Sequence, residues 1–122
     1  MKRSLFNQWI ESLRSGNYNQ TTEVLRDDGG FCCIGVLGDI HPATHWESND
    51  LFQPLPGYEE SDVPCDDTEL TEEFLQTLNL PVETQKDLVR LNDEDNASFE
   101  YIAEYLESIA GSDQLPIEED EE

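Results

Sequence analysis

The side chains best suited to chemistry in this sequence are three cysteines and two histidines. Cys32 and Cys33 are adjacent, His41 and His45 follow, and Cys65 lies further along the chain. Thiolate and imidazole groups bind zinc in proteins, and a cysteine beside a histidine base can act as a nucleophile. The spacing favours neither role, because there is no Cys-x-x-Cys pair and a proline separates the two histidines. Adjacent cysteines rarely satisfy disulfide geometry, so we expect reduced thiols buried in the core.

A second set of potential ligands is the oxygen-rich run from Asn92 to Glu104. An EF-hand loop that begins at Asp93 would place Ser98 where the turn needs glycine. A loop that begins at Asn92 would end at Ala103 rather than at a bidentate glutamate. The same residues fit a turn followed by a helix cap. We therefore expect no metal site and no cofactor.

Signals for an enzyme are weak throughout the chain. Gly29 and Gly30 are not followed by the Lys-Ser/Thr pair of a phosphate-binding loop. Carboxylates are so frequent that no single pair of them indicates general acid–base catalysis. We expect a protein that is not an enzyme and has no catalytic residues.

The strongest signal is the uneven distribution of charge. The chain has 29 acidic and 6 basic residues, for a formal net charge of −23. Residues 1–30 carry four acids and four bases, whereas residues 59–122 carry 22 acids against only Lys86 and Arg90. Proteins that bind DNA need Lys and Arg to displace the counterions of the phosphates. The composition therefore excludes direct nucleic-acid binding and favours a basic partner.

The candidate partner-binding residues are acids that lie on or beside helices of the second half. Those of the last helix share one face, and carboxylates at such spacing approach the charge density of a nucleic-acid backbone. The sequence thus predicts a protein that imitates DNA and occupies a basic, nucleic-acid-binding groove. The alternative is a small structural or metal-handling protein whose acidity reflects a salty medium or serves solubility. The full set is Glu69, Glu72, Glu73, Asp93, Glu94, Asp95, Glu100, Glu104 and Glu107.

Apolar periodicity predicts a compact, helix-rich α+β domain with one small antiparallel β-hairpin and an acidic C-terminal helical half. Strands at 21–26 and 31–34 would form the hairpin around a turn at 27–30, and Gly35–Ile40 is interpreted as a buried helical turn. We expect one core cluster that includes Trp9, Phe31, Phe74, Phe99, Ile102 and Leu106. Helical spacing with capping residues occurs at 4–14, 66–78, 81–91 and 98–110.

Two segments lack such periodicity. Four prolines fall within about 41–67, which predicts a long ordered loop. Residues 113–122 are acidic and poor in apolar side chains, which predicts a flexible tail after a single domain of residues 1–112. The longest apolar run, Phe31–Leu37, is too short to span a membrane, so we expect a cytoplasmic protein. The oligomeric state stays open.

Several short segments resemble a family of small phage and prophage proteins. They are LRSGNYNQ at 13–20, LRD at 25–27, GFCCIGVLGD at 30–39, LND at 91–93 and SFEYIA at 98–103. The chain departs from the family at Gly38, where a third cysteine is expected, and at Thr21 and Thr22, where glycine is common. The resemblance implies an α+β fold and a viral setting, and it carries no activity. In that setting the basic partner would be a host polymerase, nuclease or defence enzyme in the host cytoplasm.

Overall fold

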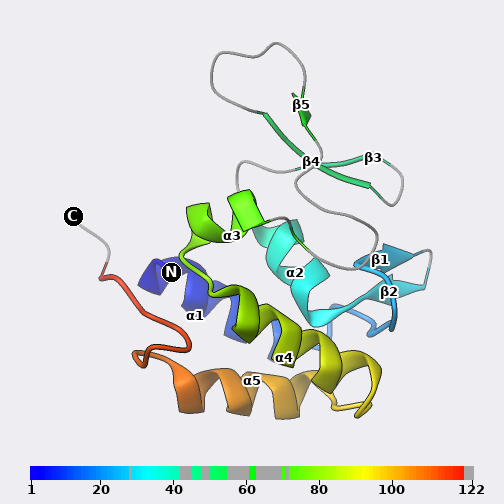
Figure 1. Cartoon of the computed structure of the whole chain (residues 1–122). Coiled ribbons are helices and arrows are strands. Elements are labelled where there is room, and N and C mark those ends of the chain that lie inside the picture. The colour runs from blue at the N-terminus through cyan, green and yellow to red at the C-terminus, as the bar shows by residue number, and fades with distance from the viewer. Residues whose placement is uncertain are drawn as a thin grey trace.

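The computed structural model describes residues 1–27, 29–41, 45–47, 50–54, 61–62, 70 and 72–119. These parts of the chain form the helix-rich α+β domain that the sequence predicts, with five helices (Figure 1). The helices are α1 (Arg3–Arg14), α2 (Cys33–Ile40), α3 (Glu72–Leu78), α4 (Val82–Asp93) and α5 (Phe99–Ile109). Strands β1 (Arg26–Asp27) and β2 (Gly30–Phe31) form an antiparallel pair. A second antiparallel sheet has the order β3-β4-β5, with β3 (His45–Glu47), β4 (Asp50–Pro54) and β5 (Ser61–Asp62).

Helix α5 follows the sequence prediction closely. The Ser98 hydroxyl accepts a hydrogen bond of 3.1 Å from the Tyr101 backbone N–H, as an N-cap residue does. Gly111 has a φ of +86°, a left-handed conformation in which glycine ends helices without strain. The buried face of α5 packs against α1 and consists of Phe99, Ile102, Ala103, Leu106 and Ile109.

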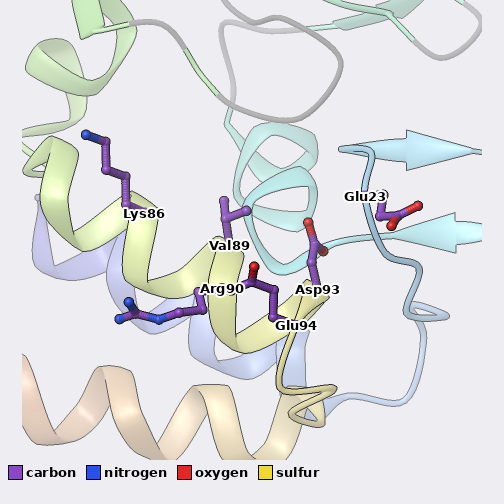
Figure 2. A pocket seen from close by; sticks show the side chains of 6 residues that line it. All are labelled: Glu23, Lys86, Val89, Arg90, Asp93 and Glu94. Atoms are coloured by element: carbon purple, nitrogen blue, oxygen red, sulfur yellow. The ribbon is translucent and has the colours of Figure 1, made fainter.

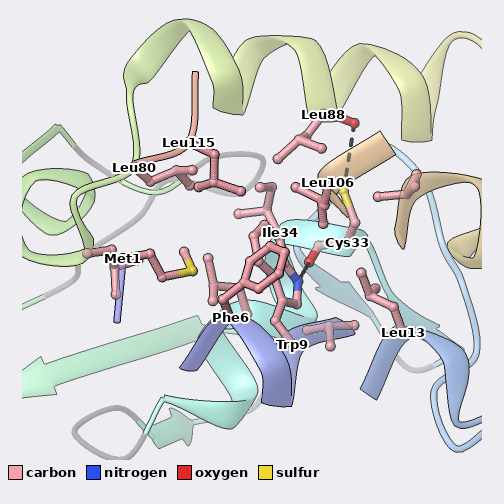
Figure 3. Close-up of a cluster of buried hydrophobic side chains, with 14 of the residues drawn as sticks. Met1, Phe6, Trp9, Leu13, Cys33, Ile34, Leu80, Leu88, Leu106 and Leu115 are labelled. Atoms are coloured by element: carbon pink, nitrogen blue, oxygen red, sulfur yellow. Dashed lines mark hydrogen bonds between the residues drawn. The ribbon is translucent and has the colours of Figure 1, made fainter. Parts of the chain in front are cut away.

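The hydrophobic core forms one cluster, as predicted. Five of the six residues expected there are buried, and Phe31 lies partly buried at its edge. The Phe31 ring meets Tyr18 edge-on, with ring centroids 5.1 Å apart. At the centre, the Trp9 indole N–H donates a hydrogen bond of 3.0 Å to the Cys33 carbonyl, which joins α1 to α2 (Figure 3). A buried indole thus keeps a partner for its one polar group.

The predicted hairpin exists but is shorter than expected. Its strands are only two residues each, and α2 begins at Cys33, where the sequence predicts a strand. The reason is a helix cap: the Cys32 sulfur accepts a hydrogen bond of 3.3 Å from the Gly35 backbone N–H. The interpretation of Gly35–Ile40 as helical is confirmed, and the helix is longer than one turn.

Helix α4 also extends beyond its predicted end. It continues to Asp93, so that Asn92 is a fully buried helical residue rather than part of a turn. Its side-chain amide donates hydrogen bonds of 2.8 Å to the Thr21 carbonyl and to the Asp93 carboxylate. Its carbonyl oxygen accepts from the Gln20 side chain at 2.8 Å and from the Cys33 backbone N–H at 3.3 Å. Buried polar side chains are stable only when paired, and here tertiary partners pair this one.

The prediction of a loop over about 41–67 is wrong in the described parts of that range. Strands β3, β4 and β5 occupy them, on the side of α2 away from α5 (Figure 1). Of the four prolines, Pro54 is described, as the last residue of β4, and the other three lie outside the described residues. Pro54 lies beyond the register of β3 and is paired with β5 alone, an edge position of the kind in which a sheet tolerates proline.

Residues 113–119 are packed against the N-terminus, which differs from the predicted flexible tail. Leu115 is fully buried, and the backbone N–H of Glu118 donates to the Met1 carbonyl at 2.8 Å. The Glu118 carbonyl in turn accepts from the Arg3 N–H at 2.8 Å. Leu115, the partly buried Ile117 and these backbone bonds hold an otherwise acidic segment.

Candidate partner-binding site

The three acids predicted for the last helix do lie on one exposed face. Glu100, Glu104 and Glu107 are exposed on α5, on the side opposite its buried residues. Successive members are three or four residues apart, so their carboxylates follow one another along the helix axis. This row is the most regular part of the predicted acidic surface.

Arg14, the last residue of α1, reaches across to this row. Its Nε donates to a carboxylate oxygen of Glu100 at 3.2 Å, and its Nη2 donates to Glu107 at 2.6 Å. This guanidinium lowers the pKa of Glu107, and that carboxylate raises the pKa of Arg14. Glu104 forms no ion pair with any described residue. Arg14 therefore neutralises part of the negative charge of this row on the side that faces α1. The sequence does not reveal this contact, because Arg14 lies in the charge-balanced first part of the chain.

The acids at the end of α4 lie in a mixed environment. Glu94 and Asp95 are exposed, whereas Asp93 belongs to α4 and accepts a hydrogen bond from Asn92. Asp93 and Glu94 line an open hollow of about 390 Å³, which Figure 2 shows between α4 and the segment before β1. The other lining residues are Glu23, Lys86, Val89 and Arg90. Both cations there already pair along α4, Lys86 with Glu83 at 3.6 Å and Arg90 with Asp87 at 2.7 Å.

Of the acids predicted for the helix before Pro81, Glu72 is described and does not join the α5 row. Glu72 is exposed on α3, and Figure 1 shows α3 and α5 on opposite sides of α4. Glu69 and the side chain of Glu73 lie outside the described parts. The exposed Glu94 and Asp95 belong to the short connection between α4 and α5, whereas Glu72 on α3 lies on the other side of α4.

The basic residues of the described chain are scattered over its surface and each has a partner within the fold. Near the N-terminus, Lys2 pairs with Glu118 at 3.7 Å and Arg3 with Glu119 at 3.0 Å. Arg26 lies over the Phe31 ring, with its guanidinium carbon 5.4 Å from the ring centroid. Since Arg14, Lys86 and Arg90 are also paired with acids, the described surface offers no cluster of cations to phosphate groups.

Cys32 and Cys33 are buried in the core. Burial raises the pKa of the Cys32 thiol to about 11 and that of Cys33 well above its ordinary value, so both are protonated at neutral pH. The Cys33 thiol donates to the Leu88 carbonyl at 3.7 Å (Figure 3). Protonated, enclosed thiols are poor nucleophiles and poor metal ligands.

Among the described side chains, His41 does not complete a ligand set with these two cysteines. The His41 ring packs edge-on against Phe74 with centroids 5.4 Å apart, and burial lowers its pKa. Among the described residues no group of three or more His, Cys, Asp or Glu could hold a metal ion. The side chain of His45 and the whole of Cys65 lie outside the described parts. The expectation that the protein binds no metal stays a prediction.

In the segments that carry the family resemblance, main chains pack closely against one another. A Cβ atom at Gly30 would lie 2.3 Å from the Asn19 carbonyl oxygen, and one at Gly35 would lie 1.9 Å from that of Leu25. Asp27 accepts hydrogen bonds from the backbone N–H groups of residues 29 and 30, which closes the turn between β1 and β2. These positions require close approach of main chains, so their residue types are explained without a chemical role.

Two polar side chains of the same segments also have structural partners. Tyr18 donates its hydroxyl to Asp39 at the end of α2, and burial together with this bond raises the pKa of Tyr18 to about 12. Gln20 donates to Asn92 at 2.8 Å and to the Ala97 carbonyl at 2.7 Å. These polar side chains of the segments are thus paired within the fold, whereas the carboxylates of α5 are exposed.

Fold and surface together define a small, acidic, helix-rich α+β domain with a row of carboxylates on its last helix. Among the described residues, no helix is long and apolar enough to cross a membrane. Residues 1–110 match the model of a family described as a domain of unknown function (DUF8296), and the chain belongs to that family. The match reaches from α1 to the end of α5 and so includes the carboxylate row. No curated protein and no solved structure matches the chain.

Proposed function

We propose that this protein is a binding protein, not an enzyme, and that its acidic α5 face occupies the nucleic-acid-binding groove of a basic partner. The observation that carries this proposal is the exposed row of Glu100, Glu104 and Glu107 on a helix anchored by five buried residues. A rigid helix keeps its carboxylates in register, so little ordering entropy is lost when a partner binds. Complementary charge then steers the encounter.

The Arg14 contact supports the chemistry of this proposal. One guanidinium is held at once by Glu100 and Glu107, seven residues apart along the helix. Basic grooves that bind nucleic acid present arginines for the same type of charge-assisted bond to phosphate oxygens. Carboxylates on α5 offer comparable acceptors, and beyond Arg90 the sequence has no Lys or Arg to repel such a groove.

The setting follows from the resemblance to phage and prophage proteins. In that setting the protein acts in the host cytoplasm, and its partner is a host polymerase, nuclease or defence enzyme. Occupation of the groove would inhibit the partner or redirect it. Neither a cofactor nor a metal takes part in this mode of action.

One observation favours the alternative, in which acidity serves only solubility or a salty medium. Exposed acids also occur away from α5, at Glu72 on α3 and at Asp113 after α5. If general acidity were the purpose, the position of a carboxylate on the surface would not matter. The two candidates therefore differ in whether binding depends on the α5 face or on total charge.

The experiment compares two variants with the same loss of charge. Glu100→Gln, Glu104→Gln and Glu107→Gln are combined in the first. The matched control combines Glu72→Gln, Glu83→Gln and Asp113→Asn, which are exposed acids off the α5 face. Each protein is immobilised and exposed to host lysate at low and high salt.

The proposal predicts that the wild type and the matched control retain the same basic, nucleic-acid-binding protein at low salt and release it at high salt, while the α5 variant does not retain it. Equal loss in both variants would assign binding to total charge rather than to this face. Recovery of no such protein by the wild type would contradict the proposed function.

A further inference from the structure

Tyr101 is the one large hydrophobic side chain that stays exposed among the described residues. It lies on α5 between Glu100 and Glu104 in sequence, and 55% of its surface is accessible. Exposed aromatic residues are enriched at the centres of protein interfaces, where they supply contact area at low entropic cost. Nothing within the described fold requires this ring, because the buried face of α5 is complete without it.

The ring borders a hollow at the junction of α4 and α5. The hollow has a volume of about 510 Å³, large enough for the end of a long side chain. Leu91 and Ala97 give it a partly apolar wall, and Asp95 places a carboxylate at its rim. The remaining lining residues are Asn96, Ser98 and Tyr101 itself.

The charge around this hollow is negative and uncompensated. Arg14 reaches the other edge of α5, and Arg90 pairs with Asp87 on α4. Neither Asp95 nor Glu104 forms an ion pair with a described residue, and residues 91–122 contain no Lys or Arg. The Tyr101 ring shares this hollow with the Asp95 carboxylate, and Glu104 follows it three residues further along α5, so the surface is complementary to cations.

We propose that this edge of α5 is the docking site for an arginine-rich segment of the partner protein, with one guanidinium stacked on the Tyr101 ring and paired with the Asp95 carboxylate, which lines the same hollow. The inference rests on the proposed function and specifies the chemistry of its partner. Arginine fits better than lysine, since its planar guanidinium stacks on aromatic rings and forms two parallel hydrogen bonds with a carboxylate. Within the chain itself, the Arg26 guanidinium carbon lies over the Phe31 ring, 5.4 Å from its centroid.

The test uses two synthetic peptides of equal length and charge, one rich in arginine and the other rich in lysine. Their affinities for the full chain are measured by calorimetry at low salt. The variants are Tyr101→Ala, which removes the ring, and Tyr101→Phe, which keeps it. Because Tyr101 is exposed, both are expected to fold, and circular dichroism checks this.

The wild type is expected to bind the arginine-rich peptide more tightly than the lysine-rich one. Tyr101→Ala should weaken the arginine-rich peptide by about threefold to thirtyfold, the range of a cation–π contact, with a smaller effect on the lysine-rich peptide. Tyr101→Phe should retain most of the preference.

Two results would overturn the inference. If both peptides bind but Tyr101→Ala leaves their affinities unchanged or lowers them equally, the face acts through charge alone and the arginine site is wrong, although the proposed function stands. If neither peptide binds the wild type, the proposed function fails together with the inference.

Discussion

Gly30 and Gly35 show, among single residues, why the segment GFCCIGVLGD at 30–39 serves the packing of the fold. Both lie where another main chain passes so closely that a methyl group would collide with a carbonyl oxygen. Sequence patterns alone identify such glycines as turn residues or helix residues, since the neighbouring chain that excludes a side chain is known only from the tertiary structure. The residues exposed to a partner are instead carboxylates of ordinary type.

Replacing Gly35 by alanine should therefore destabilise the fold. The new Cβ would lie 1.9 Å from the Leu25 carbonyl oxygen, so α2 must shift away from that segment. Overpacking of this kind costs about 1–3 kcal/mol or more. Gly29→Ala is the control, because its Cβ would meet only Asp27 at 3.4 Å, an ordinary contact. Thermal denaturation should show a clear loss for the first variant only, and equal melting curves would refute the close packing of α2.

Glu107 and Glu104 differ in their partners, which predicts different pH dependence of stability. Arg14 lowers the pKa of Glu107, so their ion pair stabilises the fold above the ordinary Glu pKa of 4.5 and is lost as the pH falls through the lowered value. Glu107→Gln should be less stable than the parent near neutral pH, and the difference should vanish in strong acid. Glu104→Gln should be no less stable at either pH. Chemical denaturation at two pH values checks both, and a deficit for Glu107→Gln that persists in acid would contradict this reading.

Among the elements, α1 and α5 could be predicted from the sequence, because apolar spacing and a following glycine agree in both and a capping serine adds to them in α5. The end of α4 could not, since the run from Asn92 to Asn96 has turn composition and only the tertiary partners of Asn92 explain its burial. The carboxylate row on α5 was predicted from helical spacing alone. Its contact with Arg14 was not, because nothing local relates the end of α1 to α5.

Replacing Leu106 tests how strongly the packing of α5 stabilises the fold. It is fully buried in the cluster shown in Figure 3, on the face of α5 that packs against α1. Leu106→Ala should cost about 2–5 kcal/mol, the sum of lost transfer free energy and the cavity that remains. Tyr101→Ala, on the exposed side of the same helix, should cost far less. Urea denaturation gives both values, and an unchanged midpoint for Leu106→Ala would remove it from the core.

For the whole molecule, a formal net charge of −23 on 122 residues means that the acidic side chains repel one another and destabilise the folded state. Salt screens it, so the free energy of unfolding should rise from low to moderate ionic strength. A partner interface that depends on the same charges should weaken over that range. The protein should thus become more stable and a poorer binder under the same change of conditions.

If the α5 face replaces nucleic acid in the groove of a basic partner, as we propose, the two ligands must exclude each other. This is measured by competition between this protein and duplex DNA for the partner retained from lysate. Added DNA should displace the wild type and the matched control in a concentration-dependent way, and the α5 variant should not displace bound DNA. A complex in which the partner holds the wild type and DNA together, without mutual loss of affinity, would contradict the proposal.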